Sequence, residues 1–283
     1  MLVRQHSDSA DGLSFMKETY RLNNDLFDSL IFITVKVHDE DILVLFDTGA
    51  SISIISQSLA KRFDFQTVGW LTAGNNNGKL FTIEKGHLNG LEICGLPIEN
   101  SEVGIVPDNY LDFGVDEKGR AFPARMLLGW DIISRFYWRI DTKNKLYSVS
   151  KRSNKKTNNL SYFNFPAIKL NYKTECMLFG LDTGHTETLL DESWRFKLNN
   201  LQPVEDEFNG VGGSSVEQSF VADNLEIFFG NEKICLKKAT VLRHPIYGLK
   251  NNRIVGLLGI DFFENSVFEI DYGNRYFHIE KYD

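Results

Sequence analysis

The stretch FDTGAS, residues 46–51, directly follows three apolar residues, Leu43, Val44 and Leu45. An acid, a small hydroxyl residue and a glycine after an apolar run are typical of a turn that ends a strand. Taken alone, this Asp-Thr-Gly tripeptide indicates no more than such a turn. The stretch LDTGHT, residues 181–186, contains the same tripeptide. This second copy suggests that the two turns belong to a longer internal repeat.

Further pairs of segments repeat at almost the same distance along the chain. Asp47 and Asp182 of the two tripeptides are separated by nearly the same length of chain as Gly129 and Gly259 of two Leu-Leu-Gly elements. The other matched segments are NGLEICG with DNLEIFFG, LLGWDII with LLGIDFF, and RIDTKNKLYSVSK with EIDYGNRYFHIEK. Four matches in the same order indicate a tandem duplication of a unit of about 120 residues, near the usual size of a domain.

The segment KRSNKKTNNLS, residues 151–161, separates the two repeats. It is polar and basic and has no apolar periodicity, which favours a solvated linker over a nucleic-acid-binding patch. We therefore expect a first lobe over residues 21–150 and a second lobe over residues 162–283. Residues 1–20 are expected to form an arm, either loose or added as a strand to the edge of one lobe.

The composition argues against several classes of function. The formal net charge of −7 argues against nucleic acid as the main partner. No apolar run is long enough to span a membrane. The first residues lack the apolar core of a signal peptide, so we expect either no export by this route or a signal removed from the N-terminus, and the compartment stays open. The three cysteines are far apart, which argues against a disulfide framework and fits no metal site.

Each repeat is predicted to consist mostly of β-strands. Apolar segments on both sides of a polar turn predict hairpins over residues 29–49 and 165–184. Short helices are expected over residues 55–63 and 191–198. A further short helix is expected after each Leu-Leu-Gly element, capped by the aspartate two residues after its glycine. Successive hairpins with sparse short helices predict an all-β, closed or sandwich-like antiparallel architecture.

The duplication gives the two aspartates a possible chemical role. A tandem repeat has a pseudo-two-fold axis, and residues near this axis meet their counterparts. If the two turns lie between the lobes, Asp47 and Asp182 face one another and share a proton. The ionised carboxyl can then take a proton from a water molecule while the protonated one donates to a carbonyl oxygen. Such a pair can add water to an amide without a metal ion or a covalent intermediate.

The neighbours of the two aspartates suit this chemistry. Gly49 and Gly184 leave no side chain that would block the substrate or the opposite turn, and their N–H groups can reach a carboxylate. Thr48 and Thr183 can form hydrogen bonds across the axis and hold the two turns together. These four residues are therefore the candidate supporting residues of the site.

Two Asp-Thr-Gly motifs, each followed at a similar distance by an apolar-apolar-Gly element, resemble the aspartic peptidases. This family includes two-lobed pepsin-like enzymes and retroviral-type proteases, in which the second half is a second subunit. The resemblance covers about residues 28–283 and implies an acid-protease β-barrel fold with pseudo-two-fold symmetry. It also implies that Asp47 and Asp182 are the catalytic dyad, and that Gly129 and Gly259 lie under the Asp-Thr-Gly loops.

The resemblance further implies an endopeptidase that uses no metal and no organic cofactor. Its substrate would be a polypeptide in extended conformation, bound in the cleft between the lobes. Because both halves lie in one chain, we expect a monomer. The alternative is a peptide-binding member of the same fold that has lost turnover, or a narrowly specific processing enzyme. Intact Asp-Thr-Gly motifs in both halves favour the active enzyme.

The family closes a β-hairpin flap over the substrate, and a glycine-rich stretch follows each Asp-Thr-Gly motif at a comparable distance. They are TAGNNNGK, residues 72–79, and NGVGGSS, residues 209–215. The second stretch could be a phosphate-binding loop, but no P-loop lysine follows it. We expect both stretches to be flap tips, as in a fused retroviral dimer. The candidate flap residues are Gly74, Asn77, Gly78, Gly212 and Gly213.

The two halves differ beside the dyad, where Ser51 follows Ala50 in the first half and Thr186 follows His185 in the second. The imidazole could perturb the dyad, shape a subsite, or point away and pair with Glu187, and the last is favoured because an isolated histidine rarely does chemistry. The flap tyrosine of pepsin-like enzymes is missing. A nearby tryptophan could cover the site or fill the core. The candidate subsite residues are Ser51, His185 and Trp70.

Overall fold

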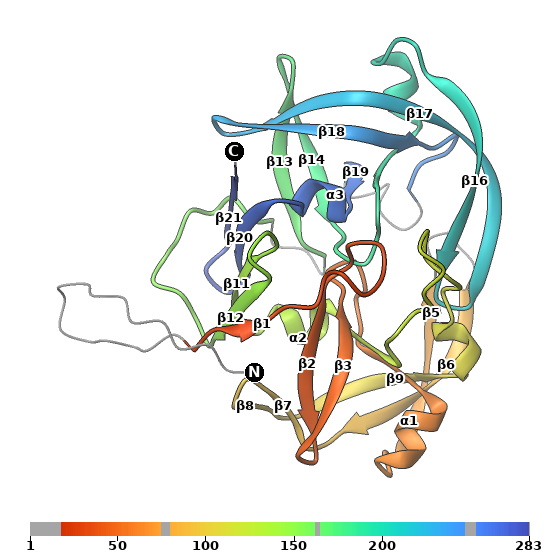
Figure 1. Cartoon of the computed structure of the whole chain (residues 1–283), viewed down its shortest axis with the longest axis vertical. Coiled ribbons are helices and arrows are strands. Elements are labelled where there is room, and N and C mark those ends of the chain that lie inside the picture. Colours follow the sequence, from red (N-terminus) through yellow and green to blue (C-terminus); the bar gives the residue numbers. More distant parts are fainter. Residues whose placement is uncertain (1–17, 75–79, 162–164, 247–252, 283) are drawn as a thin grey trace.

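The computed structural model describes residues 18–74, 80–161, 165–246 and 253–282, and these residues form three β-sheets. We call them the N-terminal sheet, the C-terminal sheet and the central sheet. In Figure 1 the N-terminal sheet occupies the lower half of the molecule, the C-terminal sheet the upper half, and the central sheet the left side between them. The prediction of an all-β fold with sparse short helices is confirmed.

The N-terminal sheet has nine strands in the order β5-β6-β9-β4-β10-β3-β2-β7-β8. The predicted hairpin is β2 and β3, and its tight turn has positive φ at both central residues, His38 (48°) and Asp39 (66°), as a two-residue hairpin turn requires. The strands are β2 (Phe32–Val37), β3 (Glu40–Phe46), β4 (Ile54–Ser56), β5 (Thr67–Gly74), β6 (Leu80–Leu88), β7 (Leu91–Ile93), β8 (Leu96–Ile98), β9 (Ser101–Val106) and β10 (Met126–Leu128).

The C-terminal sheet has seven strands in the order β13-β14-β19-β15-β18-β17-β16. Read from β16, this order reproduces the first seven strands of the N-terminal sheet, including the parallel pairing of β14 with β19 that matches β3 with β10. The duplication seen in the sequence is therefore present in the strand topology. The strands are β13 (Ala167–Tyr172), β14 (Glu175–Leu181), β15 (Thr188–Leu190), β16 (Gln202–Gly210), β17 (Gly213–Phe229), β18 (Glu232–Val241) and β19 (Ile254–Leu258).

The central sheet joins strands from both repeats in the order β1-β12-β11-β20-β21. Its middle pair is antiparallel, with Arg139 directly opposite Glu269. These two residues occupy equivalent positions in the two repeats, so the pseudo-two-fold axis passes between them. The strands are β1 (Tyr20–Arg21), β11 (Tyr137–Asp141), β12 (Leu146–Ser150), β20 (Ser266–Asp271) and β21 (Tyr276–Lys281).

The expected N-terminal arm falls mostly on residues 1–17, which lie outside the described residues. Its last part, β1, pairs with β12 at the edge of the central sheet. One hydrophobic core cluster contains side chains from all three sheets. Trp138 of β11, for example, packs edge-on against Phe46 of β3, with ring centroids 4.9 Å apart. The central sheet thus supports the strand that leads into the first Asp-Thr-Gly turn.

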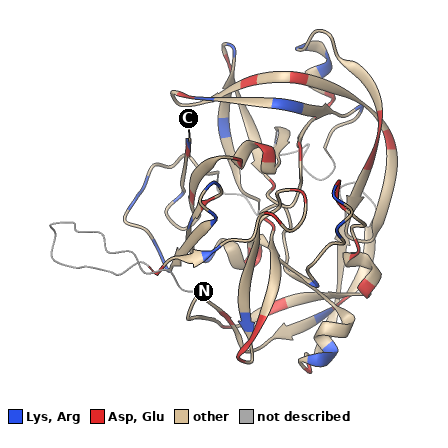
Figure 2. Ribbon diagram, viewed as in Figure 1, with Lys and Arg blue, Asp and Glu red and all other residues tan. Residues whose placement is uncertain are grey.

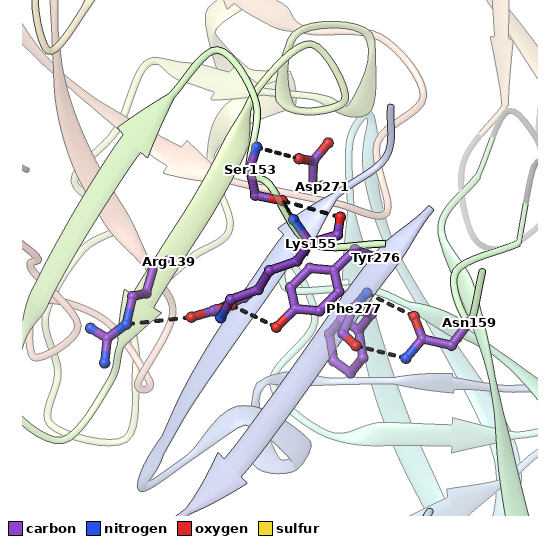
Figure 3. A network of polar contacts seen from close by, with 8 residues as sticks. Arg139, Ser153, Lys155, Asn159, Asp271, Tyr276 and Phe277 are labelled. Atoms are coloured by element: carbon purple, nitrogen blue, oxygen red, sulfur yellow. Dashed lines mark hydrogen bonds and ion pairs between the residues drawn. The ribbon is translucent and has the colours of Figure 1, made fainter. Parts of the chain in front are cut away.

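The expected linker, residues 151–161, is largely exposed but is held against the central sheet (Figure 3). The Ser153 backbone N–H donates to Asp271 (2.7 Å), and Asn159 Nδ2 donates to the carbonyl oxygen of Phe277 (2.8 Å). Lys155 Nζ lies 2.7 Å from a carboxylate oxygen of Glu269. The segment between the repeats therefore follows a defined path along the sheet.

The short helices lie near their predicted positions, except the one over Asp108–Leu111, which was not predicted. They are α1 (Gln57–Arg62), η1 (Asp108–Leu111), α2 (Trp130–Ile133), η2 (Glu192–Phe196) and α3 (Ile260–Phe263). The prediction that aspartates cap α2 and α3 is wrong, because the caps are glycines, Gly129 and Gly259, without a side-chain hydrogen bond. The carboxylates of Asp131 and Asp261 instead bind the chain segments that follow the Asp-Thr-Gly turns.

Candidate active site

The two Asp-Thr-Gly turns occupy equivalent places at the ends of β3 and β14. Each aspartate continues the parallel pairing of its strand, since the Asp47 N–H donates to Leu128 O (3.0 Å) and the Asp182 N–H to Leu258 O (2.9 Å). Apolar strands buried on both sides hold these turns: Phe46 and Leu181 are fully buried. The aspartates therefore start from rigid, nearly identical backbone positions.

The two threonines bind the turns to one another. The Thr48 N–H donates to Thr183 Oγ1 (3.1 Å), and the Thr183 N–H donates to Thr48 Oγ1 (3.0 Å). Each hydroxyl donates in turn to a carbonyl oxygen of the opposite strand, Thr48 to Leu181 (2.9 Å) and Thr183 to Phe46 (2.7 Å). Both threonines are completely buried, so this reciprocal network fixes the distance between the turns.

The glycines of the turns bring each aspartate against the opposite half. A Cβ atom on Gly49 would overlap the carboxylate of Asp182, and one on Gly184 would overlap the carboxylate of Asp47. Such contacts exist only when the two carboxylates converge on the same space across the pseudo-axis. The Asp47 carboxylate accepts from the N–H groups of Gly49 (2.9 Å) and Ala50 (3.0 Å). The Asp182 carboxylate accepts from the N–H of Gly184 (3.2 Å).

The setting makes ionisation of both carboxyl groups costly. Burial and the negative charge of Asp182 raise the pKa of Asp47 to about 7, against the two backbone N–H groups that favour its charged form. Burial raises the pKa of Asp182 to about 6, although hydrogen bonds from the Gly184 N–H and with Asp47 lower it. Because the two groups interact, they titrate as a pair. Between about pH 6 and 7 the pair holds about one proton, which is the state that can act as acid and base together.

The glycines of the Leu-Leu-Gly elements lie beneath these loops. A Cβ on Gly129 would come within 2.6–2.8 Å of the backbone of Ile52 and Ser53, and one on Gly259 would overlap the backbone of Glu187. A side chain at either position would therefore displace the backbone that follows the Asp-Thr-Gly turn. Gly129 and Gly259 thus lie where two segments of the backbone cross closely.

Two hydroxyl–carboxylate pairs brace the same loops, and our sequence reasoning missed them. Asp131 accepts from both the N–H and the hydroxyl of Ser53 (2.8 Å each). Asp261 accepts in the same way from Thr188, at 3.1 Å and 2.8 Å. Burial raises the pKa of Asp261 to about 6, opposed by these hydrogen bonds. The sequence did contain a signal for these two aspartates, because Asp131 and Asp261 follow their Leu-Leu-Gly elements by the same number of residues.

A cavity of about 500 Å³ opens above the two aspartates. Its lining comes from both halves of the chain and includes Asp47, Asp182, Ser51 and His185. Two hairpins also contribute, β5–β6 through the segment 71–74 and β16–β17 through the segment 206–211. The space is large enough for several side chains of a bound ligand.

The predicted flap residues lie at the ends of these two hairpins. Gly74 ends β5 and lines the cavity, whereas Asn77 and Gly78 lie outside the described residues. Gly212 lies in the turn between β16 and β17 and Gly213 begins β17, with φ values of 89° and 127°, which favour glycine. This turn crosses to the other half of the chain (Figure 1), where the Gly212 N–H donates to Tyr110 O at 3.4 Å.

His185 and Trp70 lie in different surroundings. His185 lines the cavity, and its Nδ1 lies 2.7 Å from the backbone oxygen of Glu187, so the ring is anchored on the main chain and not on the Glu187 carboxylate. Burial lowers the pKa of His185, although Glu187, Asp261 and Asp47 act in the opposite direction. Trp70 is 67% exposed and is not among the residues that line the cavity. It points outward because Leu71 takes the inward face of β5.

The described residues contain neither a metal-ligating cluster nor a membrane-spanning helix. No group of three or more histidine, cysteine, aspartate or glutamate side chains among them is arranged to hold a metal ion. In the same part of the chain no helix has the length and apolar character to cross a membrane. The three cysteines are free.

Part of the chain matches a model of a known protein family. Residues 33–135 match the family model described as gag-polyprotein putative aspartyl protease. No curated protein matches the chain. The matched segment contains the first Asp-Thr-Gly turn, the β5–β6 hairpin and Gly129, and the family supports a general protease function with a polypeptide substrate. A family model of a retropepsin-like aspartyl protease domain therefore covers residues 33–135.

Proposed function

We propose that this protein is an aspartic endopeptidase in which one chain supplies both halves of the active site. The observation that carries the proposal is the convergence of Asp47 and Asp182, each against the glycine of the opposite turn, at the base of one cavity. In this proposal residues 21–150 and 162–283 are two retropepsin-like lobes joined by residues 151–161. Because both aspartates come from one chain, we propose that the monomer is active.

The proposed reaction uses the single proton that the pair holds. A water molecule between the carboxyl groups gives a proton to the ionised one while its oxygen attacks the peptide carbonyl carbon. The protonated carboxyl donates to the carbonyl oxygen, so the tetrahedral intermediate forms without a free charge. A proton then passes to the amide nitrogen and the C–N bond breaks. The backbone N–H groups on Asp47 and Asp182 keep the carboxylates oriented through these steps.

The two hairpins suit an extended polypeptide substrate. The segments 71–74 of β5 and 206–211 of β16 border the cavity from opposite halves of the chain. Both β5 and β16 are edge strands of their sheets, so they have backbone groups that an added strand can bind. Backbone hydrogen bonds to two hairpins would hold the peptide straight across the two aspartates.

The test is cleavage of a mixed peptide library over a range of pH, with and without a pepstatin-type inhibitor. We expect cleavage by the wild-type protein and none by Asp47→Asn or Asp182→Asn. The matched control is Asp41→Asn, which removes an exposed carboxylate in the β2–β3 hairpin, paired only with Lys36 at 3.2 Å. Cleavage that survives Asp47→Asn would refute the mechanism, and peptide binding without any cleavage would favour a peptide-binding protein instead.

A further inference from the structure

The two sides of the cavity differ in chemistry. On the side of the first half, Phe27, Phe113 and Phe122 form an aromatic wall. The ring of Phe122 packs edge-on against Phe27, with centroids 5.3 Å apart, and against Phe113, with centroids 4.6 Å apart. Phe27 and Phe122 are buried, so the wall is a rigid apolar surface. A surface of this kind binds bulky apolar side chains.

On the side of the second half, Glu187, Asp206, Glu207 and Lys238 form an acidic wall. Lys238 Nζ lies 3.0 Å from Glu187, so this ion pair compensates one carboxylate. Asp206 accepts a hydrogen bond from Ser219 (2.7 Å), which is neutral. For Glu207 no ion pair or side-chain hydrogen bond occurs within the described ranges. Three carboxylates and one ammonium group leave an excess of two negative charges.

Within the acidic wall Asp206 is less exposed than its neighbours on the hairpin, whereas Glu207 is exposed on the opposite face of β16. Acidic residues recur along the β16–β17 hairpin, at the right of Figure 2, but only those near its cavity end line the site. Asp206 shares its strand face with the buried Phe208 and is itself half-buried. Carboxylates that line a concave space next to apolar walls concentrate their field there. The same field acts on whatever chain lies over Asp47 and Asp182.

We propose, on the basis of the proposed function, that the cavity selects polypeptides with a bulky apolar residue on one side of the cleaved bond and a lysine or arginine on the other. The apolar side chain would pack on the aromatic wall of the first half. The cationic side chain would lie against Asp206, on the face of β16 that also carries the buried Phe208. Both walls line the same cavity as the dyad, so in this proposal the two side chains flank the bond that the dyad attacks.

The experiment compares otherwise identical peptides that differ in the residue next to phenylalanine: lysine, glutamine or glutamate, in both orders. At about pH 6.5 the carboxylates of ordinary aspartates and glutamates are ionised. We expect kcat/KM for the better lysine peptide to exceed that for its glutamate counterpart about tenfold or more, the size of one favourable charge contact. The double variant Asp206→Asn/Glu207→Gln should bring this ratio close to one. The matched control is Glu205→Gln, on the same strand but outside the cavity lining, which should leave the ratio as it is.

Binding of the same peptides to Asp47→Asn protein separates this inference from the proposed function. The inference is supported if Asp47→Asn protein binds the lysine peptide more tightly than the glutamate peptide, and if the triple variant Asp47→Asn/Asp206→Asn/Glu207→Gln loses this difference. This result supports the inference even if the wild-type protein cleaves nothing. Equal cleavage and equal binding of lysine and glutamate peptides would overturn it, even if the protein is an active peptidase. A charge preference that persists in Asp206→Asn/Glu207→Gln would also overturn it.

Discussion

The two Asp-Thr-Gly turns are nearly identical in their contacts with one another and different in their contacts with the cavity. The threonines exchange equivalent hydrogen bonds, and each glycine lies against the opposite aspartate. The next residue breaks the symmetry. The Ala50 N–H donates to the Asp47 carboxylate, whereas the His185 N–H donates to the backbone oxygen of Asp182 (3.2 Å). The turns have stayed alike where they must fit each other and have diverged where a ligand would lie.

The pseudo-axis in the central sheet shows what a single chain gains from such divergence. In a dimer of identical subunits, the residue on a two-fold axis faces its own copy, and a charged residue would be repelled. Here the two positions have become Arg139 and Glu269, with Nε 3.6 Å from the carboxylate. Fusion of the halves therefore permits complementary charges at the axis.

The largest expected effect tests whether the unequal backbone contacts of Asp47 and Asp182 make the two aspartates unequal in catalysis. We expect Asp47→Asn and Asp182→Asn each to lower kcat/KM on a cleaved peptide by about 10³-fold or more. Either change replaces one of the two carboxyl groups that share the proton, so one carboxyl group can no longer act as acid while the other acts as base. The two losses should be similar despite the unequal backbone contacts. Steady-state kinetics on one peptide measures both, and a variant that keeps a tenth of the activity would show that its aspartate is dispensable.

The same variants should change stability in a pH-dependent way. Since the folded-state pKa of Asp47 lies above the unfolded value, its favourable contribution exists at acid pH and is lost as the pH rises through about 7. Asp47→Asn should therefore raise the free energy of unfolding at about pH 8 and give no gain at about pH 4. Urea denaturation at both pH values measures this difference. A gain at pH 4 alone would contradict the sign.

The next effect concerns the glycines. Gly49→Ala and Gly184→Ala each place a Cβ in the space of the opposite carboxylate, so the pair must shift apart. A displacement of about 1 Å at reacting groups can lower a rate about 10²-fold, and we expect a loss of that size in kcat for both. Gly95→Ala has no neighbour within 4 Å of its Cβ, so it tests for loss through backbone strain alone. Full activity in either turn variant would mean that the carboxylates do not meet as described.

A smaller effect tests the reciprocal threonine bonds. Thr48→Val and Thr183→Val keep the shape but leave buried N–H and carbonyl groups without their hydroxyl partner. We expect each to lower the free energy of unfolding by about 2 kcal/mol. The double variant should lose less than the sum, because both belong to one network. Thr174→Val, in an exposed turn, is the control for the substitution itself. Strict additivity would mean that the two bonds form independently.

The sequence predicted the parts of the site that the repeat places by symmetry. The pairing of Asp47 with Asp182 was predicted from the repeat on the condition that the two turns lie between the lobes, because equivalent residues near an axis meet. Contacts made by only one half carried no such signal. The approach of Gly212 to Tyr110 depends on the length and twist of β16 and β17. The outward direction of Trp70 depends on the register of β5. The apolar residues around Leu71 do not alternate clearly enough to specify that register.

The ion pair of Arg139 with Glu269 at the pseudo-axis has a weaker, pH-dependent effect on stability. Burial alone would raise the pKa of Glu269, but hydrogen bonds from Lys155 and Tyr276 outweigh it and hold the pKa below its ordinary value. Its contribution is therefore present above the unfolded pKa and lost as the pH falls through the folded one. Glu269→Gln should cost about 1 kcal/mol of stability at pH 7, since Arg139 and Lys155 are half-exposed, and less at about pH 3. An equal cost at both pH values would assign the effect to packing.

The smallest effect addresses the residue that distinguishes the two turns. When protonated, His185 favours the charged form of Asp47, so the imidazolium lowers the pKa of that carboxyl. His185→Ala should therefore move the acid limb of the kcat/KM profile to higher pH, by a few tenths of a unit at the distance of a weak charge interaction. His185→Gln keeps a polar side chain that cannot be charged. If the charge is what matters, both variants move the limb equally, and a limb that moves only in His185→Ala assigns the effect to the loop anchored on Glu187.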